Sequence, residues 1–273
     1  MLKFNSFFLN RYALLGGVLV GFTVLSLGSC DTRIEGCTNV NASNFNLNAD
    51  TPCSNCCTQP QATTSFICKT DANTFSTNDI FKDVNNTSYK VKNFNLYINN
   101  IEFELKNGTK VKASTSFDYN GTSYINDFFI MNNALQITKL FNIAMPDSLV
   151  AVSVNIGLPN ALNTIDKITG ISESSQINSN EMKEPNTGQR LSWVMTYNLL
   201  NSTNNVKLGG TNTLLNLRKQ LPKALFKKGK DVKLVLTLNM TNLFQGLDLQ
   251  GSTQQTNTLI NSSLPNAISL LVE

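Results

Sequence analysis

The 273-residue sequence contains no histidine, which limits the chemistry that its side chains could do. Without imidazole, the chain cannot form a Ser-His-Asp triad, a Cys-His pair, an HExxH zinc site or a histidine pH switch. The carboxylates that remain show no pair with a diagnostic spacing. They are Asp147, Asp166, Glu173, Glu181, Glu184 and Asp248. We therefore expect a protein that is not an enzyme and that works by binding, scaffolding or anchoring.

A basic segment in the last quarter of the sequence could meet phosphate groups. Its members are Arg218, Lys219, Lys223, Lys227, Lys228, Lys230 and Lys233, and Asp231 is the acidic residue among them. Beside a membrane, such a cluster could contact anionic headgroups or lipopolysaccharide phosphates. A solvated helix face followed by a turn is the simpler interpretation, and both stay open.

The first 29 residues have the pattern of an export signal. Lys3 and Arg11 supply positive charge, and no charged residue follows between Tyr12 and Cys30. The segment ends in Leu27-Gly28-Ser29-Cys30, which resembles a bacterial lipobox. The resemblance implies cleavage before Cys30, attachment of diacylglycerol to its sulfur, and acylation of the new N-terminus with a fatty acid such as palmitate. A plain transmembrane anchor is the alternative, because the apolar run is close to the minimum length for spanning.

Lipid attachment at Cys30 would hold the mature chain at the cell envelope, on the outer membrane or a periplasmic face. Two of the 22 basic residues and none of the 18 acidic residues lie in the leader. The mature chain would therefore carry 20 basic and 18 acidic side chains. This near balance gives no support for nucleic-acid binding. The expected partner is the membrane, through the acyl chains.

All six cysteines lie between residues 30 and 68. Apart from Cys30, the disulfide candidates are Cys37, Cys53, Cys56, Cys57 and Cys68, since disulfides are the usual state in an exported chain. Five is an odd number, so one thiol stays free, is capped or pairs between molecules. Adjacent Cys56 and Cys57 fit disulfide geometry poorly. The Cys53-Ser-Asn-Cys56 spacing also occurs in zinc and redox sites, but without histidine or a βαβ pattern we interpret it as a structural staple.

Residues 36–53 resemble a short repeat of exported Bacteroidota proteins. The matching residues are Gly36-Cys37-Thr38-Asn39, Ala42, Asn44-Phe45-Asn46, Asn48-Ala49 and Cys53. The resemblance implies a small module in which Cys37 bonds Cys53. Asn39 stands where the repeat has aspartate, which weakens a cation-binding role. A crosslink would substitute for the core that so short a segment cannot build.

From Lys69 onward there is no cysteine, and apolar residues alternate with polar ones as in strands. Val91–Leu105 alternates in two phases that shift at Asn99-Asn100, which indicates a bulge or bend. Asn107-Gly108 then predicts a hairpin turn. The other predicted strands are Lys110–Ser114, Tyr124–Ile130, Val150–Ile156, Ser192–Leu199, Val206–Leu208 and Val232–Asn239.

Helical patterns are weaker than strand patterns. Thr213–Leu221 places three leucines on one helical face, and Thr241–Leu247 predicts a short helical turn. Many strands of period two predict an all-β fold, an antiparallel β-sandwich with few short helices. The predicted organisation is a signal peptide over 1–29, a lipidated Cys-rich neck over 30–68, a linker over 69–88 and the sandwich over 89–273.

Several segments of the predicted sandwich resemble, in order, the MbnP-like domain, a family of exported copper-associated proteins. They are Phe94–Ile101, Val152–Asn163, Leu191–Tyr197, Leu208-Gly209 and Val235–Gly246. The resemblance implies the fold, copper as the cofactor and a dihaem peroxidase-like partner in the envelope. Leu191 replaces a tryptophan of the family, and its copper-associated histidines are absent. The fold is therefore better supported than the metal.

A copper site in this chain would need ligands other than histidine. Thioether sulfur suits Cu(I), and on a strand Leu191, Trp193, Met195 and Tyr197 share one face. Trp193 and Met195, with Met182 from the preceding loop, are the candidate metal site, and core packing is the simpler interpretation. We expect a lipid-anchored envelope binding protein that is copper-associated or, as the alternative, a metal-free lipoprotein that binds a surface ligand or partner.

Overall fold

The computed structural model describes residues 33–113, 115–133, 136–142, 148–163, 168, 171, 175–211, 213–222 and 229–273. The predicted leader and Cys30 lie outside the described residues. Contacts divide the chain into two compact units. The described part of the smaller unit is residues 33–38 and 46–57, and the larger unit holds residues 39–45 and the described residues from Thr58 onward. Within these ranges, no helix is both long and apolar enough to cross a bilayer.

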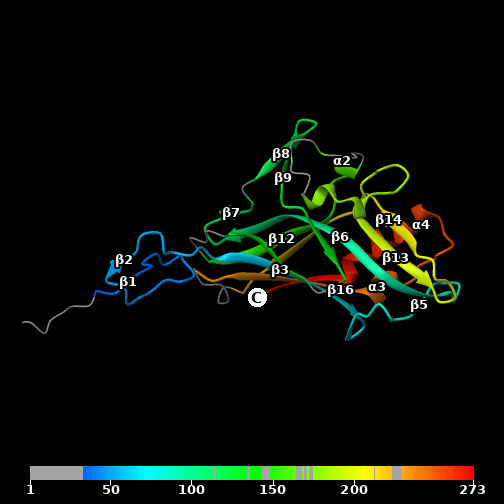
Figure 1. Cartoon of the computed structure of the whole chain (residues 1–273), viewed down its shortest axis with the longest axis horizontal. Helices are drawn as coiled ribbons and strands as arrows, with labels where there is room; N and C mark the ends of the chain where they lie inside the picture. The colour runs from blue at the N-terminus through cyan, green and yellow to red at the C-terminus, as the bar shows by residue number, and fades with distance from the viewer. Residues whose placement is uncertain are drawn as a thin grey trace, which may run out of the picture. The chain divides into compact units, whose positions relative to one another are not determined.

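The smaller unit contains one pair of short strands (Figure 1) and is closed by two disulfides. β1 (Glu35–Gly36) pairs in parallel with β2 (Thr51–Pro52). Cys37 is bonded to Cys57, and Cys53 is bonded to Cys56. The predicted Cys37–Cys53 bond is therefore wrong. Asn55, with a φ of 62°, reverses the chain inside the C-x-x-C turn, and Cys56 thereby becomes the partner of Cys53.

Two packed β-sheets form the larger unit, which confirms the predicted all-β sandwich (Figure 1). The first sheet has the strand order β14–β13–β6–β12–β15. These strands are β6 (Ser88–Leu105), β12 (Leu149–Gly157), β13 (Trp193–Leu199), β14 (Val206–Gly210) and β15 (Leu214–Gln220). Three shorter strands also pair with β6: β5 (Phe81–Lys82), β7 (Lys110–Val111) and β10 (Phe129–Asn132). All these pairs are antiparallel.

The second sheet has the order β11–β3–β16–β17, with a short strand on β3. Its members are β3 (Gln61–Thr70), β4 (Asn73–Thr74), β11 (Gln136–Asn142), β16 (Val232–Asn239) and β17 (Ile268–Val272). β16 runs parallel to β3, with Val232 opposite Ala62, while the other pairs are antiparallel. The strand nearest the disulfide unit in sequence is therefore held by a strand 170 residues later.

Alternation along the strands sorts side chains onto two apolar layers. One layer lies between the sheets and takes Leu96 and Ile98 of β6 together with Leu234 and Leu236 of β16. The other covers the outer face of the first sheet and contains Tyr97 of β6. Segments outside the two sheets close this outer layer: a hairpin of β8 (Ser116–Tyr119) and β9 (Thr122–Ile125), with α2 (Asn160–Asn163), η1 (Gln176–Asn178) and η2 (Asn180–Met182).

The predicted bulge in β6 is confirmed. The pairing with β12 shifts register between Glu102 and Asn99, and Asn100 has a φ of 48°. The buried carboxylate of Asp127 accepts hydrogen bonds from the backbone N–H groups of Asn100 (2.9 Å) and Ile101 (2.7 Å). Burial raises the pKa of Asp127, although these two backbone bonds act in the opposite direction.

Two helices follow β16 in the sequence and pack against the sandwich. α3 (Met240–Phe244) starts at the end of β16 and matches the predicted helical turn. α4 (Thr253–Ala267) was not predicted, since most of its side chains are polar. Ser252 and Gln255 form a capping box at its start, in which each side chain bonds the other residue's backbone N–H.

Two other sequence expectations need correction. Thr213–Leu221 was predicted as a helix, but its central residues form β15, which pairs with β12 along seven positions. Leu215 and Leu217 pack against the core with a period of two, so sheet pairing overrides the helical spacing. The sandwich also begins earlier than predicted, because residues 61–70, assigned to the neck and linker, form β3.

Candidate functional site

The predicted metal site is not assembled in the sandwich. Trp193 and Met195 lie on the face of β13 that meets the inter-sheet core, and both are fully buried. Met182 is buried in the outer layer with Leu191 and Val194. Leu191 therefore does not share the face of Trp193, and Met182 lies across the sheet from Met195. Trp193, Met195 and Tyr197 share one face of β13, as predicted, but Leu191 and Met182 lie in the outer layer, so Met182 does not join Trp193 and Met195.

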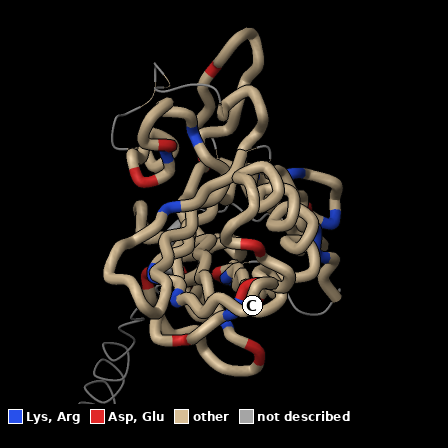
Figure 2. Tube along the Cα trace, turned by 90° about the vertical axis from the view of Figure 1, so that its right-hand side faces the viewer, with Lys and Arg blue, Asp and Glu red and all other residues tan. Residues whose placement is uncertain are grey.

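The structure describes only part of the predicted basic patch. Arg218 and Lys219 lie in β15, a strand, so their side chains point to opposite faces. Arg218 pairs with Glu104 of β6 at 2.7 Å, and Lys230 is exposed. Lys223, Lys227 and Lys228 lie outside the described residues. Basic and acidic residues are interspersed in the view of Figure 2.

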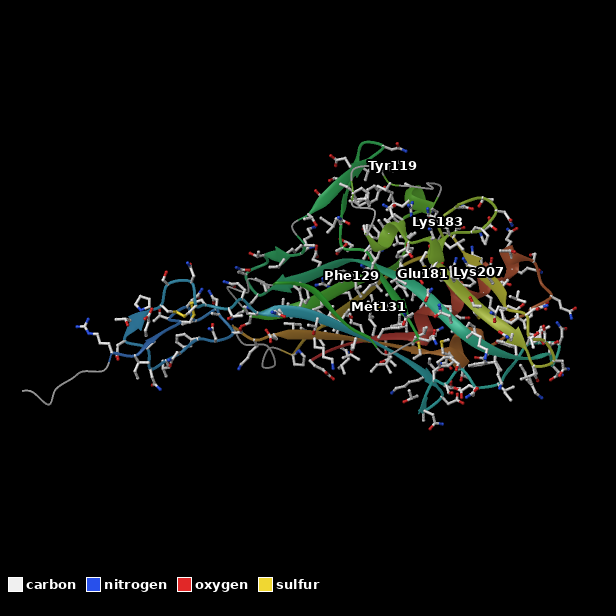
Figure 3. All side chains as sticks on the ribbon, viewed as in Figure 1. Tyr119, Phe129, Met131, Glu181, Lys183 and Lys207 are labelled. Carbon is white, nitrogen blue, oxygen red and sulfur yellow. A yellow bond between two sulfur atoms is a disulfide. The ribbon has the colours of Figure 1, made fainter. Side chains whose placement is uncertain are left out.

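The scattered carboxylates in the described chain shape loops. Glu184 accepts hydrogen bonds from the backbone N–H groups of Thr187 (2.6 Å) and Asn186 (3.0 Å). Hydrogen bonding by the Thr187 side chain, together with these backbone bonds, lowers the pKa of Glu184. Glu181 lies near Lys207 and Lys183 in Figure 3, where the Lys207 ammonium donates to the Lys183 carbonyl at 2.8 Å. Asp147, Asp166 and Glu173 lie outside the described residues.

Asp248 also serves a loop. It accepts hydrogen bonds from the Asn85 amide (2.9 Å) and the backbone N–H of Gln250 (3.0 Å). Its carboxylate thereby links the loop after β5 to the turn before α4. Of the acidic residues considered in the sequence, Glu184 and Asp248 thus accept hydrogen bonds within loops, and Glu181 lies near a lysine.

Four of the five predicted disulfide candidates are bonded, and the fifth is not. Cys68 lies in β3 as a free thiol, buried among core residues. Cys68 is therefore the thiol that the odd number of candidates left over, and it is a sandwich residue and not part of the disulfide unit. The Sγ atoms of Cys53, Cys56 and Cys57 lie within 4.8 Å of one another, but all three are in disulfides and so are not thiolate ligands for a metal.

A pocket of about 580 Å³ lies where β3 ends, and we call it the β3-end pocket. Its lining residues are Thr70, Asp71, Ile80, Phe81, Lys82, Tyr89, Thr241, Asn242, Phe244, Gln245 and Gly246. They come from the end of β3, from β5, from the start of β6 and from α3 with the turn after it. Its volume is within the range of small-molecule sites, and its lining is part apolar and part polar.

Three aromatic rings form the floor of the β3-end pocket. The ring centroid of Phe81 lies 5.6 Å from that of Tyr89 and 5.6 Å from that of Phe244. Tyr89 and Phe244 meet edge to face at 6.5 Å. Such offset and edge-on contacts stabilise an aromatic cluster beyond the area it buries. The floor is therefore rigid before any ligand enters.

One polar atom in this floor has no hydrogen-bond partner among the described residues, the hydroxyl of Tyr89. Burial, with the charge of nearby Asp83, raises the pKa of Tyr89, so the hydroxyl keeps its proton and can donate. One carboxylate oxygen of Asp83 binds the backbone N–H groups of Asn85 and Thr87, while Oδ2 is buried without a partner. Buried polar groups are usually satisfied, so these two neighbouring buried atoms are an exception.

The rim of the pocket is polar and exposed. Asp71 lies there with a φ of 53°, and its backbone N–H donates to the Thr241 hydroxyl at 3.2 Å. Lys82, Asn242 and Gln245 are exposed around the opening. No sequence pattern predicted this site, since its β5 part lies in the stretch assigned to a linker. Phe75 and Phe81 were the available signal, because bulky aromatics are unusual in a solvated linker.

Comparisons with known proteins give one similar structure. No protein-family model matches the sequence, and no curated protein does. The solved structure of MbnP from Methylosinus trichosporium is similar, with a TM-score of 0.43 and 12% sequence identity, over 70% of this chain and 78% of that one. The function of the chain therefore has to come from its own residues.

Proposed function

We propose that this chain is a noncatalytic binding protein held at the cell envelope by acyl chains on Cys30. The observation that carries the proposal is the order of its parts. A leader ending in Leu27-Gly28-Ser29-Cys30 is followed by a unit closed by two disulfides and then by a β-sandwich. Disulfides persist mainly outside the cytosol. The two bridges therefore support export independently of the leader.

The anchor would be stable without a protein segment in the bilayer. A single acyl chain binds a membrane only marginally, and two or more chains hold it firmly. The lipobox resemblance implies diacylglycerol on the Cys30 sulfur together with an acyl group on its amino group. Cys37 of the disulfide unit follows only seven residues later.

The β3-end pocket is where we propose that the ligand binds. β3 begins at Gln61, soon after the last cysteine of the disulfide unit, and ends at Thr70 in the pocket wall. The pocket thus lies at the opposite end of β3 from the side on which the chain enters the sandwich. An aromatic floor with a protonated Tyr89 hydroxyl and a polar rim fits a small molecule with one apolar face and hydrogen-bonding groups at its edge.

Copper association and a dihaem peroxidase-like partner are supported only by the sequence resemblance. The thioether of Met182 lies in a different apolar layer from that of Met195, and no histidine is present to replace them. We therefore place the metal-free function first. A copper role would require ligands other than this set.

The anchor is tested on the full chain expressed in a Gram-negative bacterium. We expect mass spectrometry to find a mature N-terminus at Cys30 carrying diacylglycerol and an acyl group, and the protein to partition into detergent. Cys30→Ala should remove both the lipid and the partitioning, while Cys68→Ala, at the buried thiol, should change neither. An intact Met1 start with an unmodified Cys30 thiol would overturn the proposal.

A further inference from the structure

Three sulfur atoms of the smaller unit lie close enough for chemistry among themselves. The Sγ atoms of Cys53, Cys56 and Cys57 are within 4.8 Å of one another. They belong to two bridges, Cys53–Cys56 and Cys37–Cys57. The proposed function uses these bridges only as staples, but the two differ in ways that bear on reactivity.

The two bridges differ in access to solvent. Cys56 is exposed and Cys53 is half-buried, so an external thiol can approach this pair. Cys37 is 2% exposed, so attack at its sulfur is blocked. Attack on the half-buried Cys57 would expel Cys37 as a thiolate into a buried site. A buried thiolate is a poor leaving group because burial raises the pKa of a thiol, and the rate of disulfide exchange falls as the pKa of the leaving thiol rises.

The bridges also differ in what they close. The Cys53–Cys56 bridge spans a sequence separation of 3, and the Cys37–Cys57 bridge spans 20. A crosslink restricts the unfolded chain more when it closes a longer loop. The shorter bridge therefore contributes less to holding the unit together and can open at less cost to the fold.

We propose that Cys53–Cys56 is a thiol–disulfide exchange site that accepts two electrons from an external dithiol, while Cys37–Cys57 is the permanent staple of the unit. In the first step, one thiolate of the dithiol attacks Cys56 Sγ. The Cys53–Cys56 bond breaks, and Cys53 leaves as a thiolate and takes up a proton. In the second step, the other thiolate of the dithiol attacks the dithiol sulfur that is bonded to Cys56. The mixed disulfide breaks, and Cys56 leaves as a thiolate and is protonated. The dithiol becomes a disulfide, and the protein gains two electrons and two protons.

Backbone contacts around the site should keep the reduced pair in place to close again. The backbone N–H of Cys53 donates to the Gly36 carbonyl at 3.0 Å. That of Asn46 donates to the Cys37 carbonyl at 2.8 Å, beside the pairing of β1 with β2. None of these bonds needs the Cys53–Cys56 bridge. The backbone of the unit can therefore keep the same conformation in the oxidised and the reduced state.

The test uses the full oxidised chain, equilibrated with dithiothreitol at graded ratios of reduced to oxidised reagent. Free thiols are alkylated without denaturant and located by peptide mass spectrometry. We expect Cys53 and Cys56 to be labelled together at a ratio at least about tenfold lower than Cys37 and Cys57 need. The buried thiol of Cys68 reports unfolding of the sandwich and should stay unlabelled over that range.

Two matched double variants complete the test. Cys53→Ser/Cys56→Ser should lose the first labelling step and keep the Cys37–Cys57 bond. Cys37→Ser/Cys57→Ser should keep the first step at the same ratio. The proposal is overturned if all four cysteines open together, if Cys37 and Cys57 open first, or if Cys53 and Cys56 react only when Cys68 does. It is also overturned if either double variant departs from its expected behaviour.

Discussion

Tyr89 and Tyr97 lie in the same strand, β6, and both are fully buried, but their hydroxyl groups meet different surroundings. The hydroxyl of Tyr97 donates to the carbonyl groups of Gln176 (3.1 Å) and Ile177 (3.2 Å). That of Tyr89 has no partner among the described residues and lies at the β3-end pocket. Burial raises the pKa of both groups, so both keep their protons at neutral pH.

This contrast makes a prediction with an internal control. Tyr97→Phe should lower the free energy of unfolding by about 1 kcal/mol, because two carbonyl groups lose their donor. Tyr89→Phe should change it by less than about 0.5 kcal/mol or raise it, because it removes a buried polar atom that has no partner. Urea unfolding followed by circular dichroism measures both. An equal loss in the two variants would mean that the Tyr89 hydroxyl is already satisfied and would remove it from the ligand site.

At the scale of elements, the sequence could predict the strands that are packed along their length by alternating residues. Val232–Asn239 was predicted with the bounds that β16 has, because its leucines and valines face the core. β15 was predicted as a helix, since three leucines with helical spacing outweighed the signal of a partly exposed edge strand. β3 was missed because Cys68 counted toward the disulfide segment, although it is a core residue of the sandwich.

The candidate pocket was beyond sequence reasoning for a different reason. Its walls come from the end of β3, from Phe81 in β5, from Tyr89 in β6 and from α3. The bond between Asp71 and Thr241 joins positions 170 residues apart. The pairing of β5 with β6 joins Phe81 and Tyr89, and the pairing of β3 with β16 brings the end of β3 to α3. No local pattern encodes the pairing of β3 with β16.

α4 is the element whose polar sequence gave no helical signal, so its first turn should matter to its stability. Ser252→Ala removes the side-chain bond to the Gln255 N–H and should lower the free energy of unfolding by about 1 kcal/mol. Ser262→Ala, at an exposed site within the helix, should have no effect or stabilise slightly, because alanine has the higher helix propensity. Chemical denaturation of the two variants compares them. Equal losses would show that the cap does not hold this helix.

At the scale of the whole molecule, the free thiol of Cys68 links global stability to pH. Burial raises the pKa of Cys68 from 9.0 to about 12 in the folded state. The folded state therefore retains a proton that the unfolded state releases in alkali. The contribution of this group to stability is complete below pH 9 and is lost as the pH rises toward 12.

The expected size of this effect follows from linkage. Between pH 8 and pH 10, the natural chain should lose about 1.4 kcal/mol of unfolding free energy relative to Cys68→Ala, which cannot release a proton. Guanidinium unfolding of both proteins across this range measures the difference. Parallel pH profiles would contradict the burial of an un-ionised thiol at this position. Over the same range, alkylation of Cys68 should follow global unfolding rather than local opening.

The parallel pairing of β3 with β16 has a consequence for how the polypeptide is made. β3 is the first sandwich strand to leave the ribosome or a translocation channel, yet its neighbours are residues 136–142 and 232–239. Until residues 232–239 have emerged, the edge of β3 that pairs with β16 has no native partner. Nascent chains of this protein should therefore stay dependent on holding chaperones almost to the end of synthesis, and stalled chains that end before β16 should aggregate.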